Sequence, residues 1–200
     1  MQHFYESIYG WFDFQGTYSS MVEKNSDGAH FVEVGTYLGR SISFLAVEII
    51  NSGKKIRLDA VDTWMGSPDE PYQQAQDDVK NGTLYENFLK NIEPVKDAIN
   101  IVRNDSVEAS KLYEDESLDF VIIDDDHSYE NCLTSIKAWY PKVRKGGIIA
   151  GDDFGVPYLG VVQAVNEFFN FNFFLQLTDR LEYVNGMSTE DMRGAWYVIK

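Results

Sequence analysis

The segment "HFVEVGTYLGRSISFLAVEII" (His30–Ile50) decides the fold class. Its first five residues form an apolar run typical of a buried strand, and Ser41–Ile50 has apolar residues on one face of a helix. Gly35 and Gly39, between the two, permit a tight turn and a close approach of the backbone to a ligand. A strand, a glycine turn and a helix in this order predict a βα unit of a parallel sheet.

The same alternation continues along the chain. Further apolar runs predict strands at Lys55–Val61, Ala98–Arg103, Leu118–Ile123 and Gly146–Gly151, and helical patterns occupy Val107–Tyr113, Tyr129–Val143 and Gly160–Phe169. Right-handed βαβ units with both faces covered by helices explain this order. The last two apolar runs, "FNFFLQL" and "GAWYVIK", have no helix between them. They predict an antiparallel pair at one edge of the sheet.

Composition narrows the class of protein. A chain of 200 residues with 44% hydrophobic content suits one domain with a sizeable core. The net charge of -15 disfavours nucleic-acid and anionic-membrane partners. No apolar run approaches the length of a membrane span, and the acidic, aromatic N-terminus does not resemble a signal peptide. We therefore expect a cytoplasmic protein, with Cys132 as a buried inert thiol, and the sequence leaves open whether it forms a homo-oligomer.

Small and acidic residues follow every predicted parallel strand, where ligands bind in doubly wound sheets. The exits read "EVGTYLGRS", "DTW", "NDS", "DDDH" and "GDDF". The G-x-x-x-G spacing at Gly35 and Gly39 fits the dinucleotide fingerprint poorly. Glu33 would repel a pyrophosphate but would suit an ammonium group. These exits favour an amino-acid-like ligand over a dinucleotide.

Four further residues at the exits are candidate ligand contacts, and three of them also have a structural interpretation. Asp62 stands where the ribose hydroxyls of a nucleoside would lie. Trp64 could stack on an adenine or roof the core. Asp105 and Ser106 could bond a base edge or cap the helix that begins near Val107, and capping is the more ordinary role of Ser106.

The stretch "FVIIDDDHSYE" (Phe120–Glu130) ends a buried strand on three adjacent aspartates. Carboxylates this close repel one another, and at least one of them is expected to resist ionisation. A solvated loop is one explanation. The other is a positive partner, either a metal ion or a cationic ligand.

Five motifs together resemble the class I S-adenosylmethionine-dependent methyltransferases, and more narrowly the group of macrocin-type sugar O-methyltransferases and cephalosporin hydroxylase-like proteins. They are "FVEVGTYLGRSISFLA", "DAVDTWMGS", "FVIIDDDHSYE", "VRKGGIIAGDDF" and "GVVQAVNEFF", spread over roughly Phe31 to Phe169. The resemblance implies a Rossmann-like, doubly wound, mostly parallel seven-stranded sheet with an antiparallel edge strand. It also implies S-adenosylmethionine as the cofactor.

The resemblance places the cofactor residue by residue. The loop around Gly35 and Gly39 would hold the methionine part, with Glu33 facing its ammonium group and Ser41 its carboxylate. Asp62 would bind the ribose, and Asp105 with Ser106 would lie by the adenine. The complete predicted cofactor site is Glu33, Gly35, Thr36, Tyr37, Gly39, Ser41, Asp62, Thr63, Trp64, Asp105, Ser106 and Asp124.

In metal-dependent relatives, an aspartate after strand four and two acidic residues after strand five bind a divalent cation. The matching residues are Asp124, Asp152 and Asp153, and three carboxylates suit Mg²⁺. His127 would act as the general base beside Asp124, or else is a structural loop histidine. Many relatives have glycine at the position of Asp125, which is here a further ligand or an exposed bystander. Many also have a His-Asp pair where this chain has two aspartates.

The predicted function is Mg²⁺-dependent O-methylation of a small hydroxylated acceptor, such as a sugar, polyol or phenol. We expect one domain over 1–200, with an N-terminal lid segment (1–29) and an insertion over the site (63–93). Trp11, Phe12 and Trp64 would form apolar walls of a closing cover. The alternatives are an NAD-dependent oxidoreductase, a non-catalytic cofactor-binding protein, and an iron oxygenase, which would want two histidines.

Overall fold

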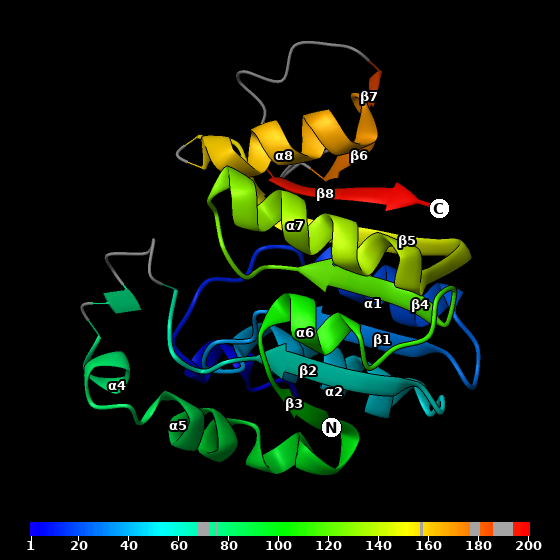
Figure 1. Cartoon of the computed structure of the whole chain (residues 1–200). Helices are drawn as coiled ribbons and strands as arrows, with labels where there is room; N and C mark the ends of the chain where they lie inside the picture. Colours follow the sequence, from blue (N-terminus) through cyan, green and yellow to red (C-terminus); the bar gives the residue numbers. More distant parts are fainter. Residues whose placement is uncertain (68–72, 75, 157, 177–180, 186–193) are drawn as a thin grey trace.

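The strands form one sheet, in the order β3-β2-β1-β4-β5-β8-β6-β7 (Figure 1). The structure is a computed structural model that describes residues 1–67, 73–74, 76–156, 158–176, 181–185 (backbone only) and 194–200. The strands are β1 (His30–Val34), β2 (Arg57–Asp62), β3 (Asn100–Arg103), β4 (Leu118–Ile123), β5 (Val143–Phe154), β6 (Asn172–Gln176), β7 (Leu181–Asn185) and β8 (Gly194–Ile199).

The pairing of the strands confirms the predicted fold class. Strands β1 to β5 pair in parallel, and β8 runs antiparallel to both β5 and β6. The sheet has eight strands rather than seven, because β7 pairs antiparallel with β6. The β6/β8 pair therefore lies one strand in from the edge. The polar segment between these strands was expected to hold no strand, and its parts 177–180 and 186–193 lie outside the described residues.

Helices cover both faces of the sheet, with α1 and α2 behind it and α6, α7 and α8 in front in the view of Figure 1. Among the described residues, no helix has the length and apolar character needed to span a bilayer. The helical segments are η1 (Tyr5–Ser7), α1 (Gln15–Lys24), α2 (Arg40–Ser52), α4 (Asp77–Lys80), α5 (Leu84–Asn91), η2 (Glu93–Ala98), α6 (Ser106–Ser110), α7 (Tyr129–Trp139), η3 (Tyr140–Lys142) and α8 (Leu159–Phe169).

Two hydrophobic cores follow from the alternation of side chains along each strand. On β4, Phe120 and Ile122 pack into the core that holds α1, α2 and α5, whereas Val121 and Ile123 pack into the core that holds α7 and α8. Strands that are apolar on both faces read as continuous hydrophobic runs. This explains why the strand pattern could be recognised in the sequence.

The strand order reverses between β1 and β4. From β1 the chain adds β2 and β3 on one side, and it then returns to place β4 against the other side of β1. The carboxyl ends of β1 and β4 are therefore neighbours from which successive connections diverge. Ligands of doubly wound sheets bind at such a reversal.

Trp64 belongs to the core, and the expectation that it forms a closing cover is wrong. Its side chain is only 3% exposed, and its ring centre lies 4.9 Å from that of Tyr85 and 4.6 Å from that of Phe88. The indole nitrogen donates a hydrogen bond to the carbonyl of Tyr37 at 3.0 Å. Because α5 folds back over the end of β2, the indole is enclosed. Trp11, in contrast, is 59% exposed.

We predict that Trp64→Ala lowers the free energy of unfolding by about 3–5 kcal/mol, because it leaves a cavity between α5 and the sheet. Trp11→Ala is the matched control and should change stability by less than about 1 kcal/mol. Urea denaturation of both variants without any ligand measures the difference. Equal effects of the two substitutions would contradict the placement of Trp64 in the core.

Candidate active site

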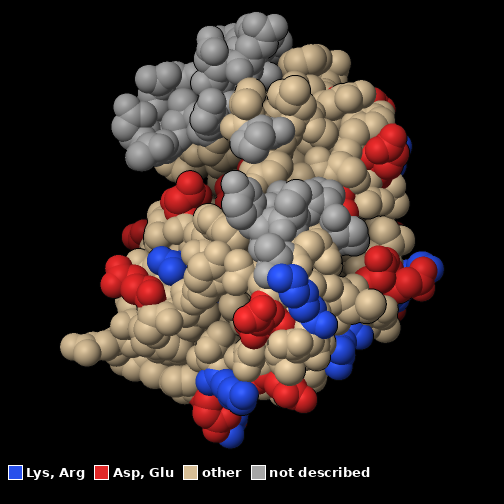
Figure 2. Space-filling model, turned by 90° about the vertical axis from the view of Figure 1, so that its left-hand side faces the viewer, with Lys and Arg blue, Asp and Glu red and all other residues tan. Residues whose placement is uncertain are grey.

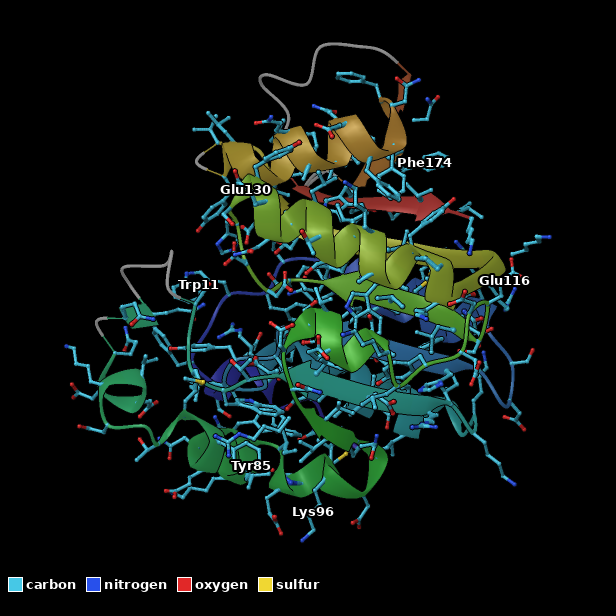
Figure 3. All side chains as sticks on the ribbon, in the orientation of Figure 1. Trp11, Tyr85, Lys96, Glu116, Glu130 and Phe174 are labelled. Atoms are coloured by element: carbon cyan, nitrogen blue, oxygen red, sulfur yellow. The ribbon has the colours of Figure 1, made fainter. Side chains whose placement is uncertain are left out.

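A cavity of about 590 Å³ lies at the carboxyl ends of β1, β4 and β5. Its walls come from the loop after β1, the aspartates that end β4 and β5, and residues 9–13 of the N-terminal segment. Figure 2 views this side of the molecule and shows acidic side chains spread across it. In Figure 3, Trp11 lies on this side, and Glu116 lies at the opposite end of the sheet. Of the predicted lid segment 1–29, only residues 9–13 line this cavity.

The loop after β1 presses directly against the end of β4. Gly35 has φ +86°, and a Cβ atom there would lie 1.9 Å from the carbonyl oxygen of Asp124. Gly39 has φ +88°, and a Cβ atom there would meet the side chain of Ile92 at 2.8 Å. The two glycines thus have separate purposes. Gly35 lets β1 and β4 meet inside the cavity, and Gly39 lets α2 begin against η2.

Asp62 holds this loop in place. One of its carboxylate oxygens accepts the backbone N–H groups of Thr36 and Tyr37, each at 2.8 Å, and the other accepts that of Trp64 at 2.7 Å. Burial raises the pKa of Asp62, and these backbone hydrogen bonds oppose that rise. The side chain also lines a second cavity of about 230 Å³, together with Thr63. Asp62 therefore shapes the predicted cofactor loop as well as lying where a ribose is expected.

Glu33 lies beneath the same loop in a closed hydrogen-bond network. It is 1% exposed, and its two oxygens accept the hydroxyl groups of Tyr18 and Ser41, each at 2.6 Å. Burial raises the pKa of Glu33 to about 7. The hydroxyl of Ser41, which the resemblance assigns to the cofactor carboxylate, is thus donated to Glu33. The predicted contact of Glu33 with an ammonium group remains a prediction.

Asp105 and Ser106 both line the second cavity. Asp105, not Ser106, caps α6, because its carboxylate accepts the N–H groups of Val107 and Glu108. The hydroxyl of Ser106 lies 2.9 Å from that of Ser135 and accepts the indole N–H of Trp139 at 3.0 Å. The capping role that the sequence favoured for Ser106 is therefore wrong.

An acidic group with one histidine lies where β4 and β5 end. Oxygen or nitrogen atoms of Asp124, His127 and Asp153 all lie within 4.8 Å of one another, close enough to hold one metal ion. His127 Nε2 is 2.8 Å from a carboxylate oxygen of Asp153. The predicted set held Asp152 in place of His127. Asp152 lines the same cavity but is outside this group of three.

A backbone irregularity presents the two aspartates of β5. The register between β5 and β8 shifts between Gly151 and Phe154, and Asp153 has φ +60°. A bulge of this kind re-aims side chains and is common beside active sites. A non-glycine residue in the left-handed region is uncommon and carries backbone strain. The strained turn places Asp153 against His127, whose ring also stacks on Tyr158 with a centre distance of 4.2 Å.

The aspartates that line this cavity lie close together, with too little positive charge nearby to balance their negative charges. Burial, reinforced by the charges of Asp152 and Asp153, raises the pKa of Asp124 well above its usual range. Burial and the charges of Asp153 and Asp13 raise the pKa of Asp152 to about 8. A divalent cation held by such a group would remove this repulsion. The donor set of two carboxylates and one imidazole therefore fits a divalent metal ion.

Asp125 faces away from the acidic group. One of its oxygens accepts the hydroxyl of Ser135 at 2.8 Å, and the other accepts the N–H of Asp126 at 2.8 Å. Burial raises the pKa of Asp125 to about 6. The residue is thus neither an exposed bystander nor a member of the described group of potential metal ligands. It ties the end of β4 to α7 at the border of the two cavities.

The structure also brings residues into the cavity that the sequence did not single out. Tyr9, Asp13, Arg40 and Tyr158 all line it. Only Arg40 had a usable signal, since it directly follows Gly39 at the start of a helix. Tyr9 and Asp13 come from the predicted lid segment, whose pattern does not single out individual residues, and Tyr158 comes from a segment without a site pattern. Three residues that were predicted to contact the cofactor are in neither described lining: Glu33, Gly39 and Trp64.

Comparison with known proteins identifies the family. A family model described as a methyltransferase domain matches residues 32–154, and the chain belongs to this family. No curated protein matches the chain. The predicted membership of the class I S-adenosylmethionine-dependent methyltransferases is thereby confirmed.

Solved structures share the fold at low sequence identity. The O-methyltransferase NovP matches with a TM-score of 0.65 and 15% identity, over 92% of this chain and 78% of NovP. A SAM-dependent O-methyltransferase from Thermotoga maritima matches with a TM-score of 0.55 and 13% identity, over 95% and 64%. An rRNA methylase from Streptococcus thermophilus matches with a TM-score of 0.54 and 12% identity, over 94% of each chain.

Gly35 and Gly28 offer a matched test of the β1–β4 contact. Both have positive φ, but a Cβ atom at Gly28 would meet nothing within 4 Å. We predict that Gly28→Ala costs about 1–2 kcal/mol of stability, from backbone strain alone, and leaves binding of S-adenosylhomocysteine unchanged. Gly35→Ala should cost more and should abolish detectable binding, measured by calorimetry. Similar behaviour of the two variants would show that the close contact is unimportant.

The raised pKa of Glu33 predicts how the stability of the folded chain depends on pH. Its pKa is about 7 in the folded chain against an ordinary 4.5, so between these values the folded state binds the extra proton. Stability therefore falls as pH rises through this window, by up to ~3 kcal/mol from this residue. Glu33→Gln should show a smaller loss between pH 5 and pH 8 in urea denaturation. Exposed Glu93→Gln is the control, and curves for Glu33→Gln that run parallel to the wild type would refute the assignment.

Proposed function

We propose that this methyltransferase transfers the methyl group of S-adenosylmethionine to a hydroxyl group of a small acceptor, with the help of a divalent cation. The observation that carries this proposal is the shared cavity of about 590 Å³. In it, the glycine loop expected to hold the methionine part of the cofactor directly adjoins Asp124, which belongs to the group of potential metal ligands.

The donor set supports the metal. Asp124, His127 and Asp153 would hold the cation, and their two carboxylates supply the hard oxygen ligands that Mg²⁺ prefers. The imidazole extends the choice to cations such as Mn²⁺, which accept nitrogen more readily. When bound, S-adenosylmethionine supplies an electrophilic methyl group, and a divalent cation lowers the pKa of a nearby hydroxyl group.

The residues of the chain would orient the acceptor and manage its proton. Asp153 holds the imidazole of His127 through the 2.8 Å contact with its Nε2 atom, and Tyr158 stacks on the face of the ring. This support keeps the ring at a defined place in the cavity, as required of a general base or a ligand. Asp152 lines the same cavity beside this pair and is a further carboxylate of the site.

The residues that line the large cavity support a small molecule as the methyl acceptor. Tyr9, Trp11 and Phe12 line the cavity from the N-terminal segment, and Phe154 and Tyr158 line it from β5 and the residues after it. Aromatic walls around a few polar groups are typical of small-molecule sites. Among the structural neighbours are both O-methyltransferases and an rRNA methylase. The net charge of -15 favours a small acceptor over RNA.

Three alternative functions lose support. Family membership argues against an NAD-dependent oxidoreductase. An iron oxygenase would want a second histidine beside His127, but His3 pairs with Glu48 and His30 pairs with Asp59. A non-catalytic cofactor-binding protein would have no use for the strained, mutually repelling aspartates of the cavity. The acidic cavity therefore favours an enzyme over a protein that only binds the cofactor.

Calorimetric titration with S-adenosylhomocysteine, with and without Mg²⁺ or Mn²⁺, tests the cofactor part of the proposal. Transfer of a labelled methyl group to panels of sugars, polyols, catechols and rRNA then tests the acceptor. We expect cofactor binding in either condition and cation-dependent labelling of a small hydroxyl compound. Labelling of rRNA alone, or labelling indifferent to chelators, would overturn the acceptor or the metal part respectively.

Asp153→Asn provides the decisive variant. A cation that binds only the folded state raises the melting temperature by mass action. In the wild type, 10 mM Mg²⁺ or Mn²⁺, a concentration of the order used for weak sites, should raise it, and Asp153→Asn should lose most of that rise while keeping cofactor affinity within about threefold. Asp115→Asn, at the opposite end of the sheet, is the control and should respond like the wild type. A full response of Asp153→Asn would remove this residue from the metal site.

A further inference from the structure

Arg40 is the cationic exception in a cavity dominated by carboxylates. It is the first residue of α2, and among the described residues that line the large cavity it is the only Lys or Arg. Five aspartates line the same cavity: Asp13, Asp124, Asp125, Asp152 and Asp153. None of the hydrogen bonds or ion pairs recorded for Arg40 involves a carboxylate. The guanidinium therefore keeps its charge available for a ligand.

The guanidinium group is only partly satisfied by the protein. Nη1 donates a hydrogen bond to the carbonyl of Ile8 at 2.8 Å, and the group lies 5.7 Å from the centre of the Tyr5 ring. Nε is buried and has no acceptor among the described residues. A buried donor left without a partner costs about 1–3 kcal/mol. An anion at this point would recover that cost.

A second and a third donor lie in the same place. The hydroxyl of Thr36, a residue that is 2% exposed, is buried, has no partner within the described part of the chain, and belongs to the lining of the same cavity. Helix α2 starts at Gly39, which offers no side chain to cap it. The first N–H groups of a helix are then free to face an anion, and the helix dipole favours one. Thr36, Arg40 and the start of α2 thus bring together three kinds of donor suited to an anion.

We propose that Arg40 and Thr36 bind the carboxylate of the methionine part of S-adenosylmethionine, and that Arg40 thereby links cofactor binding to the N-terminal wall of the acceptor cavity. This inference rests on the proposed function. The resemblance assigned that carboxylate to Ser41, whose hydroxyl is instead donated to Glu33. The aspartates elsewhere in the cavity would repel a carboxylate, which leaves the α2 side as the place for it.

The link to the acceptor wall follows from the contact with Ile8. The side chain of Arg40 runs beneath the N-terminal segment, since a Cβ atom at Gly10 would lie 3.7 Å from Arg40 Cβ. Ile8 is buried, and the next residues, Tyr9 to Asp13, line the cavity. One guanidinium therefore contacts the backbone of the wall while facing the expected cofactor. Arg40 thus binds the cofactor directly and also couples the order of the wall to the presence of the cofactor.

Two ligands separate this role from a general structural one. S-adenosylhomocysteine carries the carboxylate, whereas 5′-methylthioadenosine keeps the adenosine and the sulfur but lacks the amino-acid group. Arg40→Met retains the length of the side chain and removes its donors. We expect this variant to weaken the affinity for S-adenosylhomocysteine at least tenfold, on the order of 1.4 kcal/mol. The affinity for methylthioadenosine should fall less than twofold, and calorimetry measures both. Thr36→Val should likewise weaken the affinity for S-adenosylhomocysteine more than the affinity for methylthioadenosine. Arg40→Lys should retain part of the affinity for S-adenosylhomocysteine.

Hydrogen exchange tests the link to the wall. In the wild type, S-adenosylhomocysteine should slow amide exchange across residues 8–13, and methylthioadenosine should not. Arg40→Met should lose this protection at ligand concentrations that saturate it. Arg103→Met is the matched control, because Arg103 also packs on a tyrosine, at 4.5 Å from the Tyr85 ring, and is in neither cavity lining. It should change neither affinity nor protection.

Each failure has its own signature. The carboxylate site would be overturned if Arg40→Met weakened the affinity for both ligands equally. It would also be overturned if both Arg40→Met and Thr36→Val kept the wild-type affinity for S-adenosylhomocysteine. Protection of residues 8–13 that persists in Arg40→Met would overturn the link to the wall. If the wild type binds neither ligand, the proposed function itself fails, which is distinguishable from both. Because Thr36→Val leaves the contact with Ile8 intact, it tests the carboxylate site even if Arg40→Met folds poorly.

Discussion

The close approach of β1 and β4 at the reversal of strand order is the constraint on which the site depends. The carbonyl of Val34 accepts the N–H of Asp124 at 2.7 Å, and the next residue, Gly35, comes so near that any side chain would overlap the Asp124 carbonyl. The sheet pairing therefore places the loop after β1 directly against the first aspartate of the acidic group. In a parallel sheet this edge also carries the exposed strand ends where ligands bind. One backbone contact thus fixes the distance between the expected cofactor and the expected metal.

Electrostatics at this edge follow from that contact. Asp124, Asp152 and Asp153 are brought together because β4 and β5 are neighbours, and burial, reinforced by their mutual repulsion, raises the pKa of Asp124 and Asp152. Such an arrangement opposes folding unless something positive is near. Glu33 avoids the same problem by another route, since burial raises its pKa to about 7 and two hydroxyl groups satisfy its oxygens. The contrast separates a structural carboxylate from a group arranged for a cation.

The fold could be predicted because its information is local. Strand runs apolar on both faces, helical periodicity and glycines at the turns are all visible along the chain, and they gave the parallel frame. Strand β7 was missed because it lies in a polar segment with no apolar run. Trp64 was misplaced because its enclosure depends on α5, more than twenty residues further on. The place of His127 in the potential metal group depends on the backbone turn at Asp153, and no residue pattern announces a left-handed aspartate. Side-chain partners were the least predictable feature, as the hydroxyl of Ser41 shows.

The two ends of the large cavity differ in charge, and that difference dictates how a cofactor can lie in it. Donors gather at the start of α2, around Arg40, whereas carboxylates gather at the ends of β4 and β5. The second cavity is lined by Asp62 and Asp105, and it shares Gly35 and Tyr37 of the same loop with the large cavity. On the proposed function, S-adenosylmethionine would lie with its carboxylate near Arg40 and its adenosine near Asp62 and Asp105, with the positive sulfur between them. That orientation would hold the sulfur near Gly35 and therefore near Asp124, one of the residues that would hold a divalent cation.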